Sequence, residues 1–383
     1  RYSKLAQSQQ ARLRDGAQNF LDQGKAPEPG FILRQPQLAN TLRAIASGGR
    51  DSFYRGAVAQ ELVRGVRAGG GIWSIEDLAH YRVIEREPLR FRFRDLKITA
   101  APLPSSAGIA LAQSLHILEQ FPLANLPEAE RAHLIVEAMR RAYEDRADYM
   151  GASSAIPVER LLSEAYAKKR AATIDKERAT KSAELESFPR EGEDTTHFSI
   201  VDREGNRVAA TLTINTAFGS ATVAGDTGVL LNNEMDDFSI APGIPNAYGL
   251  VTGEANSIQP GKRPLSSMAP TFVEDERGIL VVGTSGGSRI ISMVLLAILD
   301  FALSSELDLQ RIVALPRYHH QYLPDRIEIE PHGFSEDWQQ ALVRKGHTLR
   351  VSSRQWGNMQ AVYHDKRSGK VSAASDPRRK SEF

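Results

Sequence analysis

Two adjacent threonines, Thr195 and Thr196, stand where a charged segment without clear periodicity (181–194) meets an alternating strand pattern. A threonine hydroxyl attacks a carbonyl only when a base lies beside it. Cleavage of the Asp194–Thr195 bond would create that base, because the new α-amine has a reference pKa of about 8. The pair therefore fits an N-terminal threonine nucleophile. Two β-branched residues that simply begin an ordinary strand would give the same pattern.

A second pattern could stabilise the charge that such an attack creates. Gly286 and Gly287 precede a nearly all-apolar stretch (289–303) that predicts a buried helix. Bare backbone N–H groups at the positive end of a helix suit an oxyanion. A tight turn followed by an N-cap serine explains the same residues.

The strand predicted over 208–214 has one apolar and one mostly polar face. Thr213 and Asn215 share the polar side, so their side chains point the same way. A strand with one solvent-exposed face carries outward threonines just as often.

The composition describes an ordinary globular protein. Its 383 residues suffice for two or three average domains or one large layered domain. The net charge of +1 does not favour binding to nucleic acid or to a membrane surface. The absence of cysteine excludes disulfides and thiol catalysis. The longest apolar run, 290–303, is too short to span a bilayer.

Hydrophobic periodicity predicts a helix-rich part before Thr195 and a strand-rich part after it. Ser74 is expected to cap a short helical turn with Asp77 three residues on. Before Thr195 we expect helices over 4–24, 37–46, 57–68, 107–121, 127–149 and 158–174, and one strand over 88–101. After it we expect strands over 198–201, 208–214, 228–231, 269–273, 279–283, 348–352 and 359–363, and helices over 289–303 and 336–346.

Two histidine patterns suggest metal ligands without requiring them. His133 and Glu137 lie four residues apart on a predicted helix, a spacing that ordinary hydrogen-bonded pairs share. His319 and His320 are adjacent. We expect no metal site and no cofactor.

Several segments together resemble the γ-glutamyltranspeptidase (glutathione hydrolase) family. They occur in the family's order and cover nearly the whole chain. Before Thr195 they are DSFY (51–54), PLPSSAG (102–108) and RAYEDR (141–146). From Thr195 on they are TTHFS (195–199), NTAFG (215–219), LNNEMDDFS (231–239), KRPLSSM (262–268), GGSR (286–289) and ASDPR (374–378). The segment around His319 and His320 resembles a part of the family's structural framework, so we expect these histidines to be structural.

The resemblance implies an α+β fold of the N-terminal-nucleophile hydrolase type, a four-layer αββα sandwich. It implies self-cleavage between Asp194 and Thr195. Residues 1–194 would be the C-terminal part of a large subunit and 195–383 the small catalytic subunit, around one shared core. The Thr195 hydroxyl would attack the γ-glutamyl amide of glutathione or a related compound. The resulting γ-glutamyl ester would be resolved by water or by an amino-acid or dipeptide acceptor.

The resemblance also assigns the remaining roles. Thr213 would hydrogen-bond the nucleophile, and the amides of Gly286 and Gly287 would form the oxyanion hole. The substrate's α-ammonium and α-carboxylate would be bound by Asn215, Glu234, Asp237, Ser266 and Ser267. The acids Glu234 and Asp237 suit the ammonium, and the serine pair suits the carboxylate. An ordinary solvated turn and an ordinary loop would have the same residues. Tyr248 would be the gate of a lid over 242–250, where an ordinary surface loop is the alternative.

In the family, an arginine from a part of the large subunit that precedes the equivalent of Arg1 binds the substrate's α-carboxylate. No arginine of this chain can be assigned to that role by motif. The resemblance implies a periplasmic or secreted protein, and the chain begins at Arg1 without the apolar stretch of a signal peptide. Two alternatives stay open: a related acylase for glutaryl or cephalosporin side chains, and a non-catalytic truncated homologue.

Overall fold

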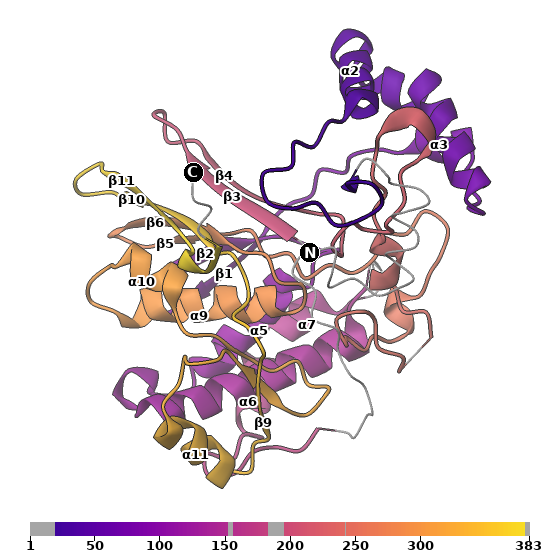
Figure 1. Cartoon of the computed structure of the whole chain (residues 1–383). Helices are drawn as coiled ribbons and strands as arrows, with labels where there is room; N and C mark the ends of the chain where they lie inside the picture. The colour runs from indigo at the N-terminus through magenta and orange to yellow at the C-terminus, as the bar shows by residue number, and fades with distance from the viewer. Residues whose placement is uncertain (1–19, 152–155, 183–194, 242, 380–383) are drawn as a thin grey trace. The chain divides into compact units, whose positions relative to one another are not determined.

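The computed structural model describes residues 20–151, 156–182, 195–241 and 243–379 (Figure 1). The chain divides into two compact units. The first unit is Arg1–Arg86 with Thr213–Glu234, and the second is Glu87–Leu212 with Met235–Phe383. Most of the helix predicted over 4–24, and Asp194 with the segment before it, lie outside the described residues.

The first unit is built from helices α2 (Pro36–Tyr54), α3 (Ala57–Ala68) and α4 (Ile75–His80) and the 3-10 turn η4 (Gly225–Thr227). On α2, the Thr41 hydroxyl donates to the carbonyl of Thr227 (2.8 Å). On α3, Glu61 accepts the N–H of Asp226 (2.7 Å). The first of these bonds is buried and the second is exposed, and together they hold η4 against the two helices.

Two predictions for this unit are confirmed and one is wrong, while the helix expected over 37–46 is present but extends to Tyr54 as α2. Helix α3 has the predicted bounds, and Ser74 and Asp77 form the reciprocal capping box at α4. The strand predicted over 228–231 is absent from the described structure, which has only an isolated bridge between Val223 and Leu230 there. Gly228 explains the failure because its left-handed φ of 69° turns the backbone out of a strand.

The second unit is organised around a six-stranded antiparallel sheet. Its order is β1-β2-β5-β6-β10-β11. The strands are β1 (Leu89–Phe93), β2 (Leu96–Ala100), β5 (Thr271–Glu274), β6 (Gly278–Gly283), β10 (Gln360–Asp365) and β11 (Val371–Ser375). Every residue of β6 is buried, as expected for a strand covered on both faces.

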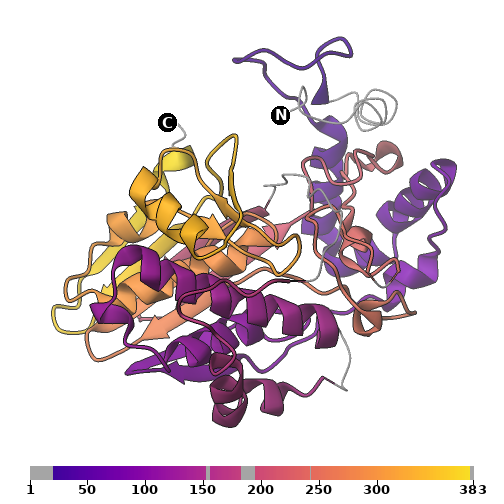
Figure 2. The same ribbon diagram turned by 90° about the horizontal axis from the view of Figure 1, so that it is seen from below.

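Helices cover one face of this sheet. They include α5 (Ala107–Leu118), α6 (Glu128–Tyr149) and α9 (Arg289–Leu303), which share one hydrophobic core with β2, β5, β6 and β10. Figure 1 shows α5 and α9 beneath the sheet with α6 below them, and Figure 2 gives the view from below. Helix α9 has the predicted bounds and is buried on nearly every side, as its apolar sequence requires.

The opposite face of the sheet carries a two-stranded hairpin, β3 (Thr195–Val201) and β4 (Arg207–Thr213), whose last residue belongs to the first unit. The Ser199 hydroxyl donates to the carbonyl of Gln360 on β10 (3.3 Å). The His197 ring lies against Gly283 of β6, in space that a side chain at 283 would fill. The described layers are therefore helices, sheet and hairpin, within an α+β fold.

Shorter elements complete the second unit. A small sheet joins β7 (Tyr318–His319), β8 (Ile327–Ile329) and β9 (Leu349–Val351). The other helices are α7 (Val158–Leu162), α8 (Glu164–Ala171), α10 (Leu309–Ala314) and α11 (Glu336–Arg344). The 3-10 turns are η3 (Leu123–Asn125), η5 (Glu234–Asp237), η6 (Glu254–Asn256) and η7 (Pro377–Arg379). Among the described residues, no helix has both the length and the apolar character needed to cross a membrane.

Two predicted elements are each divided in the structure. The single strand expected over 88–101 is a hairpin, because Arg94 adopts a left-handed φ of 51° between β1 and β2. The single helix expected over 158–174 breaks at Ser163, whose hydroxyl accepts the N–H of Tyr166 and so caps α8. Both breaks depend on one residue in a conformation that hydrophobic periodicity does not record.

Candidate active site

Thr195 begins β3, and the side chains of Thr195 and Thr196 lie on opposite faces of the strand. Thr195 and His197 are buried, whereas Thr196 and Phe198 are exposed. The His197 ring hydrogen-bonds the hydroxyls of Thr211 (2.8 Å) and Ser199 (3.1 Å). Burial lowers the pKa of His197 to about 4, so the ring is neutral at pH 7. This neutral ring fills the gap between β3 and Gly283 of β6 and so positions the strand that starts at Thr195.

Two glycines connect the end of β6 to α9 through a sharp turn. Gly286 and Gly287 both have positive φ, 141° and 58°, which glycine adopts without strain. Their carbonyls accept the N–H groups of Arg289 (3.1 Å) and Ile290 (3.2 Å). Among the described residues, neither glycine N–H has an acceptor. Two adjacent unbonded donors at the N-terminal end of a buried helix match an oxyanion hole.

Tyr248 lies directly on this turn. It is 7% exposed, and its ring occupies the space that a Cβ at Gly287 would need. Gln321 fixes it by donating from Nε2 to the Tyr248 carbonyl (3.1 Å). The predicted gate residue is thus brought to the predicted oxyanion donors. Pro242, at the start of the predicted lid, lies outside the described residues.

Asp237 is connected to the lid rather than isolated on a turn. Its Oδ1 accepts a hydrogen bond from Asn246 Nδ2 (3.3 Å), and its carbonyl accepts one from Asn256. The neighbouring Asp236 accepts the N–H of Ala247 (2.9 Å). The acidic turn and the segment that carries Tyr248 therefore form one hydrogen-bonded structure.

The serine pair is held by the loop over 102–108. The Ser266 carbonyl accepts both the N–H (2.9 Å) and the hydroxyl (2.8 Å) of Ser106, and the Ser266 N–H donates to Pro104 (2.8 Å). Arg146, on α6, donates to the hydroxyls of Ser106 (2.9 Å) and Ser267 (3.3 Å). The sequence did not single out Arg146, because its RAYEDR segment has no spacing that predicts these contacts.

The other three predicted site residues belong to the first unit. Thr213 Oγ1 accepts the N–H of Asn215 (2.8 Å), and Asn215, with a left-handed φ of 72°, donates from Nδ2 to the carbonyl of Asn233 (3.1 Å). Burial raises the pKa of Glu234, and its Oε1 is buried without a hydrogen-bond partner. The structure therefore brings Thr213 and Asn215 together and places Glu234 next to Asn233, with which Asn215 pairs.

The histidine patterns resolve into buried hydrogen-bond networks. His133 Nδ1 lies 2.7 Å from His347 Nε2, and His133 Nε2 contacts the carbonyl of Asp175 (2.8 Å). These two rings and Glu137 have potential ligand atoms within 4.8 Å of one another. However, Glu137 already accepts hydrogen bonds from Arg140 (3.2 Å) and Arg141 (2.6 Å). Two adjacent guanidinium groups oppose a bound cation.

His319 and His320 are also buried and hydrogen-bonded. His319 contacts Ser292 (2.6 Å) and Gln321 (2.8 Å), while His320 contacts Asp325 (3.3 Å). Burial lowers the pKa of each to about 4. These are the contacts expected of structural histidines.

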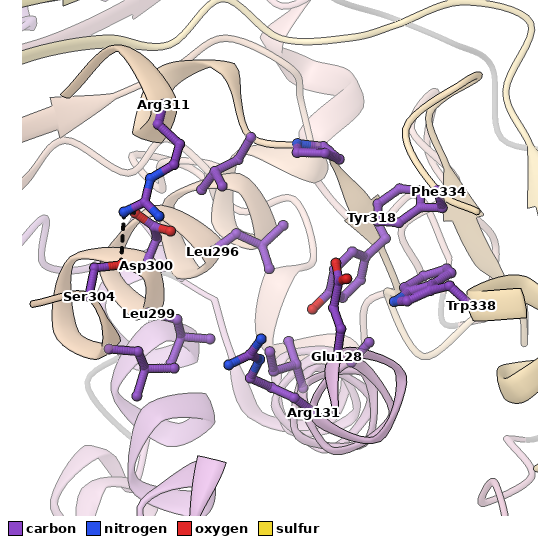
Figure 3. Close-up of a pocket in the computed structure, with 15 residues that line it drawn as sticks. Glu128, Arg131, Leu296, Leu299, Asp300, Ser304, Arg311, Tyr318, Phe334 and Trp338 are labelled. Carbon is purple, nitrogen blue, oxygen red and sulfur yellow. Dashed lines mark hydrogen bonds and ion pairs between the residues drawn. The ribbon is translucent and has the colours of Figure 1, made fainter. Parts of the chain in front are cut away.

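A separate pocket of about 260 Å³ opens between helices of the second unit (Figure 3). Leu296 and Leu299 line one side, and Tyr318, Phe334 and Trp338 form an aromatic wall. Arg311 at its edge pairs with Asp300 (3.0 Å). None of the predicted site residues lines this pocket.

Comparison with known proteins places the whole chain in one family. The model of the family "Gamma-glutamyltranspeptidase" matches residues 1–383. A glutathione hydrolase proenzyme of Pseudomonas sp. (strain A14) is 44% identical over 334 residues, which are 85% of this chain and 58% of that protein. The Escherichia coli glutathione hydrolase proenzyme is 41% identical over 367 residues, 94% of this chain and 63% of that protein.

Among solved structures, the cephalosporin acylase from Bacillus halodurans has a TM-score of 0.82 and 26% identity, over 98% of this chain and 66% of that chain. This chain thus spans about 58–63% of the two hydrolase proenzymes. The match of the family model and the likeness to both proenzymes agree with the motifs and with the glycine turn before α9. The chain belongs to the γ-glutamyltranspeptidase family.

Proposed function

We propose that the protein is a self-processing γ-glutamyltransferase and hydrolase with Thr195 as its nucleophile. The observation that carries the proposal is the pair of adjacent N–H groups at Gly286 and Gly287, which have no acceptor among the described residues and lie at the start of buried α9. Acyl transfer needs such preorganised donors where negative charge develops. The family membership and the relatives named glutathione hydrolase proenzyme support the same reaction.

The precursor step starts from the Thr195 hydroxyl. Its oxygen attacks the carbonyl carbon of Asp194, and the C–N bond breaks to give an ester and the free amine of Thr195. Water then hydrolyses the ester. By family resemblance, residues 1–194 and 195–383 become the two chains of one four-layer αββα core.

In turnover, the α-amine of Thr195 accepts the proton of its own hydroxyl as Oγ attacks the γ-carbonyl. The N–H groups of Gly286 and Gly287 bind the oxyanion, and Thr213 hydrogen-bonds the nucleophile. Collapse transfers the proton to the departing amine and leaves a γ-glutamyl ester on Thr195. Water, or the amine of an amino acid or dipeptide, then attacks the ester and restores the hydroxyl.

Substrate recognition follows from charge. Asn215, Glu234 and Asp237 bind the α-ammonium of the glutamyl group, and Ser266 and Ser267 bind its α-carboxylate. Tyr248 covers the acyl group from the lid. By family resemblance, we propose that the substrates are glutathione and related γ-glutamyl compounds in the periplasm or outside the cell. We propose no cofactor, metal or nucleic-acid partner.

A second candidate function is cleavage of another acyl amide, which the likeness to a cephalosporin acylase favours. The acidic residues Glu234 and Asp237 argue for the first function, because a glutaryl side chain has no ammonium to pair with them. Turnover of γ-glutamyl-4-nitroanilide and glutaryl-4-nitroanilide decides between the two. The proposal expects the first to react faster by a factor of about 30 or more, since leaving a charge without its partner costs roughly 2–5 kcal/mol. Faster reaction of the glutaryl compound would establish an acylase. If neither compound reacts, the chain is a non-catalytic homologue.

A further inference from the structure

Arg146 is unlike the other buried arginines of the described structure. Five arginines are buried to at least nine-tenths of their surface, and Arg146 is only 2% exposed. Four of the five form an ion pair with a carboxylate: Arg140 and Arg141 with Glu137, Arg289 with Glu328, and Arg317 with Asp376. Arg146 has no ion pair with any carboxylate that the structure describes. Burying a cation without a paired carboxylate is costly, so Arg146 is a candidate for a functional role.

The hydrogen bonds of Arg146 lead to both serines of the proposed carboxylate subsite. Its Nη2 donates to Ser267 Oγ (3.3 Å). Its Nε donates to Ser106 Oγ (2.9 Å), and that hydroxyl in turn donates to the carbonyl of Ser266 (2.8 Å). Its Nη1 is buried without a partner. One guanidinium thus holds Ser267 directly and Ser266 through Ser106.

The direction of these bonds matters for an anion. A serine hydroxyl has one proton and two acceptor lone pairs. Because Ser267 Oγ accepts from Arg146, its own proton remains available to a ligand. Burial lowers the pKa of Arg146, and the charge of Asp237 raises it in part, so Asp237 lies close enough for the two charges to interact. The guanidinium adds positive potential beside the serines, which a carboxylate would neutralise.

We propose that Arg146 is the positioning residue of the α-carboxylate subsite: it orients the hydroxyl of Ser267 and supplies the charge that a bound α-carboxylate balances. This inference rests on the proposed function for the identity of the subsite. It predicts ligands that carry a carboxylate next to an ammonium, as in an α-amino acid. Arg146 itself is buried behind the serines, so its effect reaches the ligand through Ser267 and through its charge.

Calorimetric titration of the full chain with L-glutamate and with 4-aminobutyrate tests this inference. The two probes differ only by the α-carboxylate. Arg146→Gln is expected to weaken L-glutamate binding about tenfold or more and to change 4-aminobutyrate binding less than about twofold. Arg146→Lys, which keeps the charge, should recover part of the loss. Arg344→Gln, at an exposed position of α11, is the matched control and should bind both probes as the parent does.

Kinetics give a second readout that separates positioning from general damage. With γ-glutamyl-4-nitroanilide, Arg146→Gln should raise KM about tenfold and lower kcat less than about threefold. Ser267→Ala leaves the buried charge in place and should also weaken L-glutamate binding. The double variant should lose less binding free energy for L-glutamate than the two single variants together, because both substitutions act on one contact.

Equal weakening of both probes, additive losses, or unchanged L-glutamate binding in Arg146→Gln would overturn the inference. If Arg146→Gln does not fold, unchanged L-glutamate binding in Ser267→Ala overturns it instead. Failure of the parent chain to bind L-glutamate also overturns it. A parent chain that binds L-glutamate through Arg146 but does not turn over the anilide would refute the proposed reaction and leave the subsite standing.

Discussion

The ring of Tyr248 lies against Gly287, in the space where any other residue would place its Cβ. This contact joins the lid to the turn before α9, whose two glycine N–H groups have no acceptor in the described part of the chain. Gly287 is therefore constrained twice, by its φ of 58° and by the aromatic ring. The proposed oxyanion hole and the proposed gate are one packed structure.

Gly287→Ala is expected to destabilise the fold and to lower kcat. The left-handed backbone costs a non-glycine residue about 1–2 kcal/mol, and displacement of the Tyr248 ring adds to it. Gly346→Ala is the matched control, because Gly346 also has positive φ (92°) but nothing within 4 Å of its Cβ position. Urea unfolding and anilide turnover measure both effects. Equal destabilisation of the two variants, with kcat unchanged at 287, would show that the Tyr248 contact has no role.

Thr195→Ala is expected to abolish both self-cleavage and γ-glutamyl transfer, because one hydroxyl serves both reactions. Thr195→Ser should keep some of each. The neighbouring Thr196 is exposed on the other side of β3, so Thr196→Ala should behave as the parent chain does. Electrophoresis and anilide turnover measure these outcomes. Near-normal turnover by the alanine variant at 195 would remove Thr195 from the mechanism.

Asp237→Ala is expected to raise KM far more than it slows self-cleavage. Loss of the half-buried Asp237 carboxylate as partner of the substrate ammonium costs roughly 2–5 kcal/mol, or about 30-fold or more in KM. Asp95→Ala, in the exposed turn between β1 and β2, is the control. An unchanged KM together with lost self-cleavage would mean that Asp237 acts only through its contact with Asn246.

We expect the protein to lose unfolding free energy in acid because of the buried His197. Its folded-state pKa of about 4 lies below the ordinary value of 6.5, so the unfolded state binds the proton more readily. The stabilisation by neutral His197 is complete above pH 6.5 and is lost as the pH falls toward 4. Between pH 7 and 5 the parent chain should lose about 2 kcal/mol of unfolding free energy through this residue.

Urea unfolding of the parent and His197→Gln at both pH values tests this loss. The variant should be less stable at pH 7 and should lose less on acidification. His332→Gln, at an exposed position, is the control and should follow the parent. Equal losses of unfolding free energy between pH 7 and pH 5 in the parent and in His197→Gln would contradict a neutral, buried His197.

Local patterns in the sequence predicted the elements that depend on local signals. The apolar run of α9 and the cap at Ser74 are confirmed. The strand expected over 198–201 is present as β3 but begins three residues earlier, at Thr195. Periodicity did not predict the break at Ser163 or the hairpin turn at Arg94, because one residue's backbone conformation decides each.

The site was predictable only where motifs carry chemistry. The glycines at 286 and 287 precede an apolar helix, and that position itself suggests anion binding. The role of Arg146 was not predictable, because it depends on which buried arginines find a carboxylate after folding. Similarly, the pairing of Asn246 with Asp237 joins two segments whose contact no spacing in the sequence indicates.

Intact mass spectrometry of the active protein, quenched in acid during turnover of a γ-glutamyl substrate, tests Thr195 most directly. We predict two chains, one that ends at Asp194 and one that begins at Thr195. A fraction of the second chain should carry a γ-glutamyl group on its first residue, and Thr195→Ala should give one uncleaved, unmodified chain. An intact bond between Asp194 and Thr195 in a preparation that turns over the substrate would contradict the account.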